Sequence, residues 1–324
     1  MNDGSFRQLV GSCPLFTGVR DLAYRASKND HSILLQGESG TGKELFAQAI
    51  HSTSNRASRP FVAINCSAIP DTLIESELFG YVAGSFTGAS RTGSKGKFQT
   101  ASGGTLFLDE IGDMEPRAQA AILRALQEKR ITPVGATQSI PVNVRIIAAT
   151  HRDLLKEIER GRFRSDLYYR LKVIALDLPP LRERSDLCEL AEFFLAEQDY
   201  RYPELSGAVC AALRRHSWPG NLRELKNVML QAGFLADGNP IEESHLRLDE
   251  WTGGDDIQSG SAIPTMNHLH ASVIRQALIH TNWNVKRTSE LLGIGRNTLY
   301  RKMHTYGIER RANDEHTGRF GFLQ

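Results

Sequence analysis

Short apolar runs alternate with longer helical stretches over the first part of the chain. The runs lie at residues 32–36, 61–65, 105–108, 142–150 and 172–178, and most lack the period-two alternation of a half-exposed strand. Strands of this kind are buried on both faces, which is typical of a parallel sheet covered by helices. The pattern therefore predicts an α/β sandwich for residues 1–178.

The pattern becomes helical from residue 179 to residue 251. Helical spacing of apolar positions is found at residues 185–198 and 206–216. We expect a further helix to begin with Asn221 as its N-cap, with Glu224 three residues later closing a capping box. This part is therefore predicted to form a separate helical subdomain.

Residues 252–264 are rich in Gly, Ser and Asp and offer little apolar surface to bury. We therefore predict a linker there. Beyond it, three short helices are expected at residues 271–280, 285–292 and 296–305, within a small all-α domain of residues 265–310. Residues 311–324 are expected to form a frayed tail. The length of 324 residues exceeds what one hydrophobic core usually supports, so a division into several domains is expected.

Composition narrows the class of protein. No apolar run approaches the ~20 residues that cross a bilayer, and the N-terminus lacks the basic and apolar stretches of a secretion signal. We therefore expect a cytoplasmic protein that makes no membrane contact. The four cysteines, Cys13, Cys66, Cys188 and Cys210, are far apart in the chain, which favours buried reduced thiols over a disulfide framework or a zinc site.

Residues 37–43 have the phosphate-loop pattern GxxxxGK between a predicted strand and a predicted helix. Glycines let successive N–H groups surround phosphate oxygens, the helix N-terminus adds positive potential, and Lys43 supplies a full charge. The next position, where a serine or threonine usually binds magnesium, holds Glu44. The nucleotide-binding residues predicted here are Gly37, Glu38, Ser39, Gly40, Thr41, Gly42, Lys43 and Glu44.

A second signal for a nucleotide site follows the apolar run at 105–108, which ends in Asp109 and Glu110. Open α/β sheets bind their ligands at the carboxyl ends of the strands. We expect Asp109 to hold Mg²⁺ and Glu110 to polarise the attacking water, so that ATP and Mg²⁺ are the cofactors and ATP is hydrolysed. The alternative, that the two acids only begin a helix, leaves their pairing with the upstream phosphate loop unexplained.

Residues 77–89 read ELFGYVAGSFTGA and place Phe86 between two glycines. An exposed phenylalanine there would be typical of a mobile contact tip, whereas a buried one would mean an ordinary hairpin. The stretch resembles the GAFTGA loop of the sigma-54-dependent activators, a branch of the AAA+ ATPases also called bacterial enhancer-binding proteins. Ser85 replaces the usual alanine. The resemblance implies that the residues contacting sigma-54 are Gly84, Ser85, Phe86, Thr87, Gly88 and Ala89.

This resemblance extends over about nine-tenths of the chain and implies an AAA+ sandwich with a helical lid. In this family Glu44 is the usual residue after the phosphate-loop lysine. The resemblance implies that Asn65 in FVAINC restrains Glu110 and that Thr150 in VRIIAATHRDL lies at the sensor end of a central strand. It also adds Val10 and Gly11 to the residues at the nucleotide.

Three arginines receive roles from the same resemblance. Arg164 and Arg170 in GRFRSDLYYRL are implied to reach into the neighbouring subunit's site, within a ring that is commonly a hexamer. Arg223 in WPGNLREL is implied to be the second sensor, carried by the lid. From spacing alone, Arg164 and Arg170 could equally be surface arginines.

Residues 265–310 carry a net charge of +5, while the rest of the chain sums to −3. Residues 272–308 resemble the Fis-type helix-turn-helix, with Leu299 and Met303 anchoring the second helix inward. The predicted contacts to phosphates and bases of double-stranded DNA are Arg296, Asn297, Thr298, Arg301 and Lys302. A helical hairpin used only for dimerisation is the alternative.

Together these features predict an ATP-hydrolysing activator that binds an upstream enhancer site and remodels the closed complex of sigma-54 RNA polymerase into an open promoter. Two other classes stay open: a DNA-binding regulator acting by contact or repression without remodelling, and a P-loop enzyme for a small metabolite. Only about ten residues precede the ATPase body. We therefore expect no sensor domain in this chain, and either a regulatory protein acting in trans or a longer activator of which this is a part.

Overall fold

The computed structural model describes residue 6, residues 8–85, 92–198 and 200–248, and, nearer the C-terminus, residues 274, 278, 281, 283–291, 299, 300 and 303. The chain divides into two compact units, Met1–Asp256 and Ile257–Gln324. Within the described ranges, no helix is both long and apolar enough to cross a lipid bilayer.

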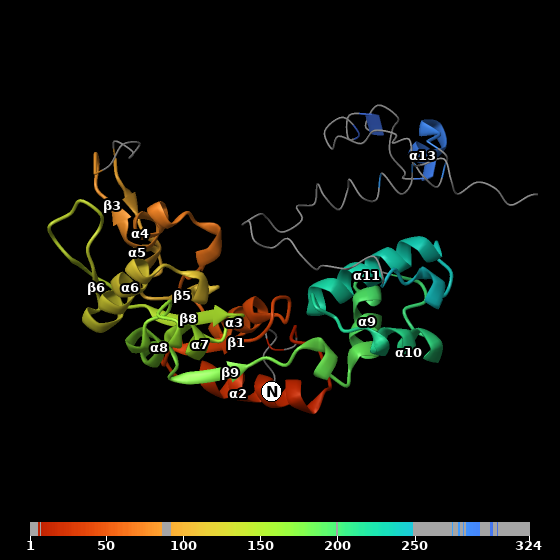
Figure 1. The fold of residues 1–324 in the computed structure, drawn as a ribbon, viewed down its shortest axis with the longest axis horizontal. Helices are drawn as coiled ribbons and strands as arrows, with labels where there is room; N and C mark the ends of the chain where they lie inside the picture. The colour runs from red at the N-terminus through yellow and green to blue at the C-terminus, as the bar shows by residue number, and fades with distance from the viewer. Residues whose placement is uncertain are drawn as a thin grey trace, which may run out of the picture. The chain divides into compact units, whose positions relative to one another are not determined.

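A five-stranded parallel sheet forms the centre of the first unit (Figure 1). Its strands, in spatial order, are β2 (Phe61–Asn65), β5 (Thr105–Asp109), β8 (Arg145–Thr150), β1 (Ile33–Gln36) and β9 (Ile174–Asp177). Each of the five strands coincides with one predicted apolar run, and β5 extends one residue beyond its run, to Asp109. The predicted parallel sheet is therefore confirmed, and the other four strands begin or end up to three residues inside the predicted limits.

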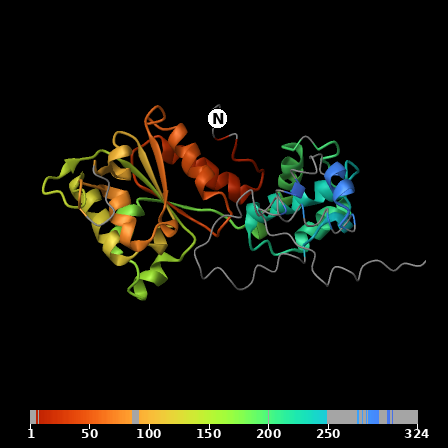
Figure 2. The same ribbon diagram turned by 90° about the horizontal axis from the view of Figure 1, so that it is seen from above.

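Helices cover both faces of the sheet (Figure 2). Successive residues of β8 show the division, because Ile147 and Ala149 pack in one apolar cluster while Ile146 and Ala148 pack in the other. The first cluster includes α2 (Pro14–Ser27) and α3 (Lys43–Ser52). The second includes α4 (Asp71–Phe79), α5 (Lys97–Thr100), α6 (Pro116–Glu128), α7 (Leu154–Glu159) and α8 (Ser165–Leu171). This is the predicted α/β sandwich.

Two short hairpin pairs stand outside the central sheet. Strand β3 (Gly80–Tyr81) pairs antiparallel with β4 (Ser94–Lys95), and β6 (Arg130–Ile131) pairs with β7 (Ile140–Pro141). The backbone N–H of Val82 donates to the carbonyl of Val134 at 3.1 Å. This hydrogen bond joins the segment after β3 to the segment between β6 and β7. The predicted sigma-54 loop follows β3: Gly84 and Ser85 are described, while Phe86, Thr87, Gly88 and Ala89 lie outside the described residues.

The predicted helical subdomain is present. It contains η3 (Leu181–Glu183), α9 (Leu187–Ala196), α10 (Gly207–Arg215), α11 (Asn221–Ala236) and η4 (Glu243–His245) around a core of its own. Trp218 is fully buried in this core, and its indole N–H donates to the Leu213 carbonyl at 2.8 Å. We call this subdomain the lid.

The prediction that Asn221 caps α11 is wrong. Gly220 is the N-cap, and Asn221 is the first helical residue, with a φ of 52°. Glu224 does reach back, but its Oε2 accepts from the backbone N–H of Gly220 at 2.8 Å. The Asn221 side chain is engaged by two other segments of the protein, and these tertiary contacts prevail over its local capping tendency.

The second unit contains α13 (Val285–Leu291). Ile274, Leu278 and Leu299 are buried together, and Met303 packs against them, so the predicted inward anchoring of Leu299 and Met303 is confirmed. The predicted DNA contacts, Arg296, Asn297, Thr298, Arg301 and Lys302, lie outside the described residues, as do the predicted linker and tail.

Candidate nucleotide-binding and hydrolysis site

The phosphate loop, residues 37–43, connects β1 to α3 at the carboxyl end of the central sheet. Gly42 is the N-cap of α3 and has a left-handed φ of 95°. Gly40 has a φ of 80°, and a Cβ there would lie 2.2 Å from the carbonyl oxygen of Gly220. Glycine is therefore required at position 40 both by its backbone conformation and by the close approach of the lid.

Lys43 is buried and joins the loop to Glu110, the predicted catalytic carboxylate. Its Nζ donates to the carbonyls of Gly37 at 2.9 Å and Glu38 at 3.2 Å. The same atom lies 3.6 Å from Oε1 of Glu110. The predicted phosphate-binding ammonium and the predicted catalytic carboxylate therefore meet at one point.

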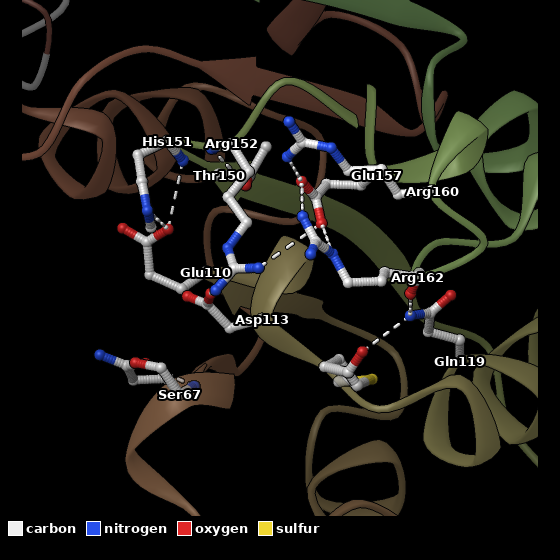
Figure 3. Close-up of polar contacts among 12 residues, drawn as sticks. Ser67, Glu110, Asp113, Gln119, Thr150, His151, Arg152, Glu157, Arg160 and Arg162 are labelled. Carbon is white, nitrogen blue, oxygen red and sulfur yellow. Dashed lines mark hydrogen bonds and ion pairs between the residues drawn. The ribbon is translucent and has the colours of Figure 1, made fainter. Parts of the chain in front are cut away.

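Glu110 follows β5 in a left-handed conformation, with a φ of 52°. Its Oε2 lies 2.6 Å from Nδ1 of His151 and accepts the backbone N–H of His151 at 3.2 Å (Figure 3). Burial acts to raise the pKa of Glu110, but the His151 hydrogen bond and the charge of Lys43 outweigh it, and the net pKa is lowered. Glu110 is therefore held as a carboxylate, the form that a base requires.

His151 was not among the sequence-predicted site residues. The hydrogen bond to Glu110 raises the pKa of its imidazole. The only feature of the sequence that pointed to His151 is its position directly after the predicted residue Thr150. That position alone does not predict a role, because a histidine at a strand end has many possible uses.

Thr150 ends β8 and is fully buried. Its carbonyl accepts the backbone N–H of Gly37 at 3.3 Å, and its Oγ1 accepts that of Arg152 at 3.0 Å. A Cβ at Gly112, in η2 (Ile111–Asp113), would lie 2.6 Å from Thr150 Oγ1, so glycine lets the segment after Glu110 approach this strand end. Thr150 thus joins the start of the phosphate loop to the segment that follows Glu110.

Asn65 lies beside Asp109 in the register of β2 and β5. Its Oδ1 accepts from the backbone N–H of Ser67 at 3.0 Å and from Ser67 Oγ at 2.8 Å. Among the described contacts of the Glu110 carboxylate, the partners are His151 and Lys43. The restraint of Glu110 by Asn65 therefore stays a prediction. It would require the Asn65 side chain to turn from Ser67 toward Glu110.

Asp109, the predicted Mg²⁺ ligand, lies at the end of β5 beside Glu110. Burial and the neighbouring charge of Glu110 raise its pKa, which is the electrostatic signature of a carboxylate that a cation would stabilise. Oxygen ligands suit Mg²⁺. Glu110, Asp113 and His151 also place ligand atoms within 4.8 Å of one another, but Asp113 is paired with Arg152 and Glu110 with His151.

The lid attaches to the phosphate loop through Asn221. Its Nδ2 donates to Glu38 Oε2 at 3.1 Å and to the Ser39 carbonyl at 3.0 Å, while its Oδ1 accepts the Leu181 N–H at 2.7 Å. Arg182 donates two hydrogen bonds, of 2.8 and 2.6 Å, to the same Glu38 carboxylate. These hydrogen bonds lower the pKa of Glu38. Sequence reasoning missed both Asn221 and Arg182 as site residues, since only the fold brings them to the loop.

A cavity of about 720 Å³ lies between the loop and the lid. Its lining includes the predicted residues Val10, Ser39, Gly40, Thr41, Gly42, Lys43, Glu44, Asp109, Glu110 and Arg223, together with Phe193 and Phe194. Arg223 Nη1 donates to Ser39 Oγ at 3.3 Å. A lining that combines polar groups with aromatic side chains suits a nucleotide.

A buried ion pair fixes the N-terminal segment against the lid. Arg184 and Asp186 are paired at 2.7 Å, with 2% and 0% of their side chains exposed. Arg184 Nη2 also donates to the Val10 carbonyl at 3.3 Å, and Asp186 accepts the Cys13 N–H at 3.0 Å. Of the two predicted residues, Val10 lines the cavity, whereas Gly11 lies against Arg184 and Asp186 and is not part of the lining.

The two predicted trans arginines do not line the cavity of their own chain. Arg164 precedes α8 and pairs with Asp166 through hydrogen bonds of 3.0 and 2.7 Å. Arg170 lies in α8 and donates to the Leu126 carbonyl at 3.1 Å. Their action at a neighbouring chain's nucleotide therefore stays a prediction.

Known families match almost the whole chain. Residues 9–177 match the Sigma-54 interaction domain, residues 182–258 the AAA+ ATPase lid domain, and residues 270–306 the bacterial regulatory protein, Fis family. The chain belongs to the sigma-54-dependent transcriptional regulators.

Individual family members are similar over most of the chain. It is 44% identical to UacR of Escherichia coli K12, described as a putative uric acid sigma-54-dependent transcriptional regulator, covering 93% of this chain and 54% of that protein. It is 43% identical to the Nif-specific regulatory protein of Azotobacter vinelandii, covering 95% of this chain and 60% of that protein. The chain thus spans somewhat more than half the length of these two regulators.

A solved structure of a similar protein supports the fold. The crystal structure of NtrX from Brucella abortus in complex with ATP has a TM-score of 0.68 and 32% sequence identity, covering 93% of this chain and 69% of that one. The predicted AAA+ sandwich with a helical lid and a Fis-type helix-turn-helix is therefore confirmed for this member of the sigma-54-dependent regulators.

Proposed function

We propose that this chain hydrolyses ATP and uses the reaction to convert the closed complex of sigma-54 RNA polymerase into an open promoter, while its C-terminal helix-turn-helix holds an upstream DNA site. The observation that carries the proposal is the meeting of Lys43 and Glu110 at 3.6 Å beside the phosphate loop, in a chain that matches the Sigma-54 interaction domain. With polymerase and DNA as its partners, the protein would act in the cytoplasm.

The loop and lid would bind ATP together. Backbone N–H groups of residues 37–43 and the N-terminus of α3 would surround the phosphates, with Lys43 adding its charge. Arg223 would contact the phosphates from the lid, beside Ser39. Mg²⁺, held by Asp109 and the phosphates, would neutralise charge developing on the transferred group.

Glu110 would orient the attacking water and accept its proton. Its lowered pKa keeps it ionised at neutral pH, and His151 fixes its direction. Arg164 and Arg170 would complete the site from the neighbouring protomer, since neither lines the cavity of its own chain. An arginine aimed at the transferring phosphoryl group contributes on the order of 10³–10⁵ in rate, so hydrolysis would depend on a ring, which we expect to be a hexamer.

Residues 84–89 would be the moving contact with sigma-54. They follow β3, and β3 directly follows α4. Helix α4 packs in the same apolar cluster as residues of β5. A shift of β5 and η2 during hydrolysis would therefore reach the loop through packed side chains. Regulation by another protein in trans fits the same scheme.

Transcription from a sigma-54 promoter with purified components tests the proposal. Wild type with hydrolysable ATP should give open complexes, whereas Glu110→Gln and a non-hydrolysable analogue should not. Phe86→Ala should hydrolyse ATP but fail to open the promoter. If Phe86→Ala regulates as well as wild type, the chain acts by contact or repression on DNA instead.

A further inference from the structure

Glu157 is a buried carboxylate surrounded by arginines outside the nucleotide cavity. It lies in α7, with 7% of its side chain exposed. Its Oε1 accepts from Arg160 at 3.2 Å and from Arg162 Nη2 at 2.7 Å, and its Oε2 accepts from Arg162 Nε at 2.5 Å. The hydrogen bonds from Arg162, opposed by burial, lower the pKa of Glu157 to about 2. The cluster is therefore charged at every physiological pH.

The backbone after α7 folds back onto the same residue. Gly161 has a left-handed φ of 71°, and the N–H groups of Arg162 and Phe163 both donate to the Glu157 carbonyl, at 2.9 and 3.1 Å. Phe163 is buried in the second apolar cluster. Glu157 therefore holds residues 161–163, which lead directly to Arg164, through its main chain and its side chain together.

The cluster also reaches the segment after the catalytic carboxylate. Arg152 lies 3.6 Å from Glu157 Oε2 through Nη1, and its other terminal nitrogen pairs with Asp113 in η2. Figure 3 shows Arg152 between Glu157 and Asp113, with Glu110 and His151 to its left. A chain of charged contacts thus joins η2 to the segment before Arg164.

Gln119 makes a second, uncharged connection between the same two segments. It is fully buried, and its Nε2 donates to the carbonyls of Met114 at 2.7 Å and Arg162 at 2.8 Å. Its Oε1 accepts the backbone N–H of Arg164 at 2.8 Å. The main chain at Arg164 is thereby tied to the end of η2.

We propose that Glu157 is a positioning residue for Arg164: it holds the segment bearing this arginine against η2, so that Arg164 is presented correctly to the nucleotide of the neighbouring protomer. The proposal rests on the proposed function, in which Arg164 acts in trans. A misplacement of ~1 Å can cost on the order of 10² in rate. Loss of Glu157 should therefore slow the neighbour's site and leave the site of its own chain intact.

Mixed assemblies of two variants of the 324-residue chain separate these sites. The donor, Glu110→Gln, does not hydrolyse ATP but supplies Arg164; the acceptor, Arg164→Ala, has an intact site but supplies no arginine. Each should be nearly inactive alone, and mixing them with the donor in excess should restore hydrolysis. Glu157→Gln added to the donor should lower the kcat of the mixture about tenfold to a hundredfold, with KM for ATP changed less than twofold.

The same substitution in the acceptor is the decisive comparison. We expect a change of less than twofold there, and Glu159→Gln, an exposed carboxylate of the same helix, should have no effect in either partner. Glu157→Asp in the donor should recover part of the rate because it keeps the charge.

Equal losses in donor and acceptor, or no loss in the donor, would overturn the role of Glu157. If mixing restores no activity even before Glu157 is changed, the trans arrangement itself fails, and this proposal with it.

Discussion

His151 Nδ1 lies 2.6 Å from Glu110 Oε2, although the two residues are 41 positions apart in the sequence. The contact joins the strand end of β8 to the first residue after β5. It supplies the carboxylate with a fixed partner on the side away from Lys43. In this structure His151, and not Asn65, holds the side chain that we expect to activate water.

The pair should make stability depend on pH. The pKa of His151 is raised from its ordinary 6.5, so its contribution is full below that value and is lost as pH rises through the raised pKa. The pKa of Glu110 is lowered from 4.5, so its contribution is full above 4.5 and is lost as pH falls through the lowered pKa. The difference in free energy of unfolding between wild type and His151→Ala should therefore be largest between about pH 4.5 and 6.5. Urea titrations at several pH values measure it, and a difference independent of pH would contradict this account.

Gly40→Ala should detach the lid from the phosphate loop. The added Cβ would meet the Gly220 carbonyl at 2.2 Å, and the φ of 80° disfavours alanine. We expect KM for ATP to rise at least about tenfold, because ~1.4 kcal/mol of lost binding energy has that effect. Gly18→Ala is the matched control, since its Cβ would meet no atom within 4 Å. Steady-state ATPase assays of both variants check the prediction, which fails if the two behave alike.

Asn221→Gly should loosen the same junction without backbone strain. Glycine accepts the φ of 52° but removes the hydrogen bonds to Glu38, Ser39 and Leu181. Leaving the buried Leu181 N–H without its acceptor costs about 1–3 kcal/mol. Thermal unfolding should show that loss, and KM for ATP should rise more than kcat falls. Unchanged stability would mean that these contacts do not hold the lid.

Arg184→Ala should be far more destabilising than an exposed counterpart. It would leave the fully buried Asp186 carboxylate without its cation, which costs about 3–5 kcal/mol. The exposed pair of Arg215 and Glu243 offers a control, because Arg215→Ala should cost less than about 1 kcal/mol. Burial acts to raise the pKa of Asp186, but the hydrogen bonds from Arg184 outweigh it, and the net pKa is lowered. The stability that the ion pair contributes to the wild type should therefore be lost as pH falls through that lowered pKa. Chemical denaturation of both variants measures the difference, and equal costs would refute it.

The sequence was sufficient to predict the sheet and the phosphate loop, because both depend on local patterns. Buried runs such as residues 145–150 have no polar alternation, and GxxxxGK needs its glycines at fixed positions. The partners of the site were not predictable in the same way. Asn221 has the local chemistry of a cap, but Glu38 and Leu181 engage its side chain, and neither contact is visible before the lid is folded.

His151 and Glu157 illustrate the same limit for charged groups. A histidine after a strand, or a glutamate among arginines, is usually a solvated side chain. Their roles depend on the left-handed turn at Glu110 and on the reversal at Gly161, which bring distant segments together. Backbone turns of this kind are set by tertiary packing.

The most direct test of the central claim, that neighbouring protomers complete each other's hydrolytic site, is the specific ATPase rate measured against protein concentration. For wild type, the rate per protomer should rise with concentration and reach a plateau as the ring assembles. Arg164→Ala should assemble to the same extent, followed by light scattering, yet stay at least about 10³-fold below that plateau. A wild-type rate per protomer that is independent of assembly, or an Arg164→Ala rate equal to wild type, would contradict the account.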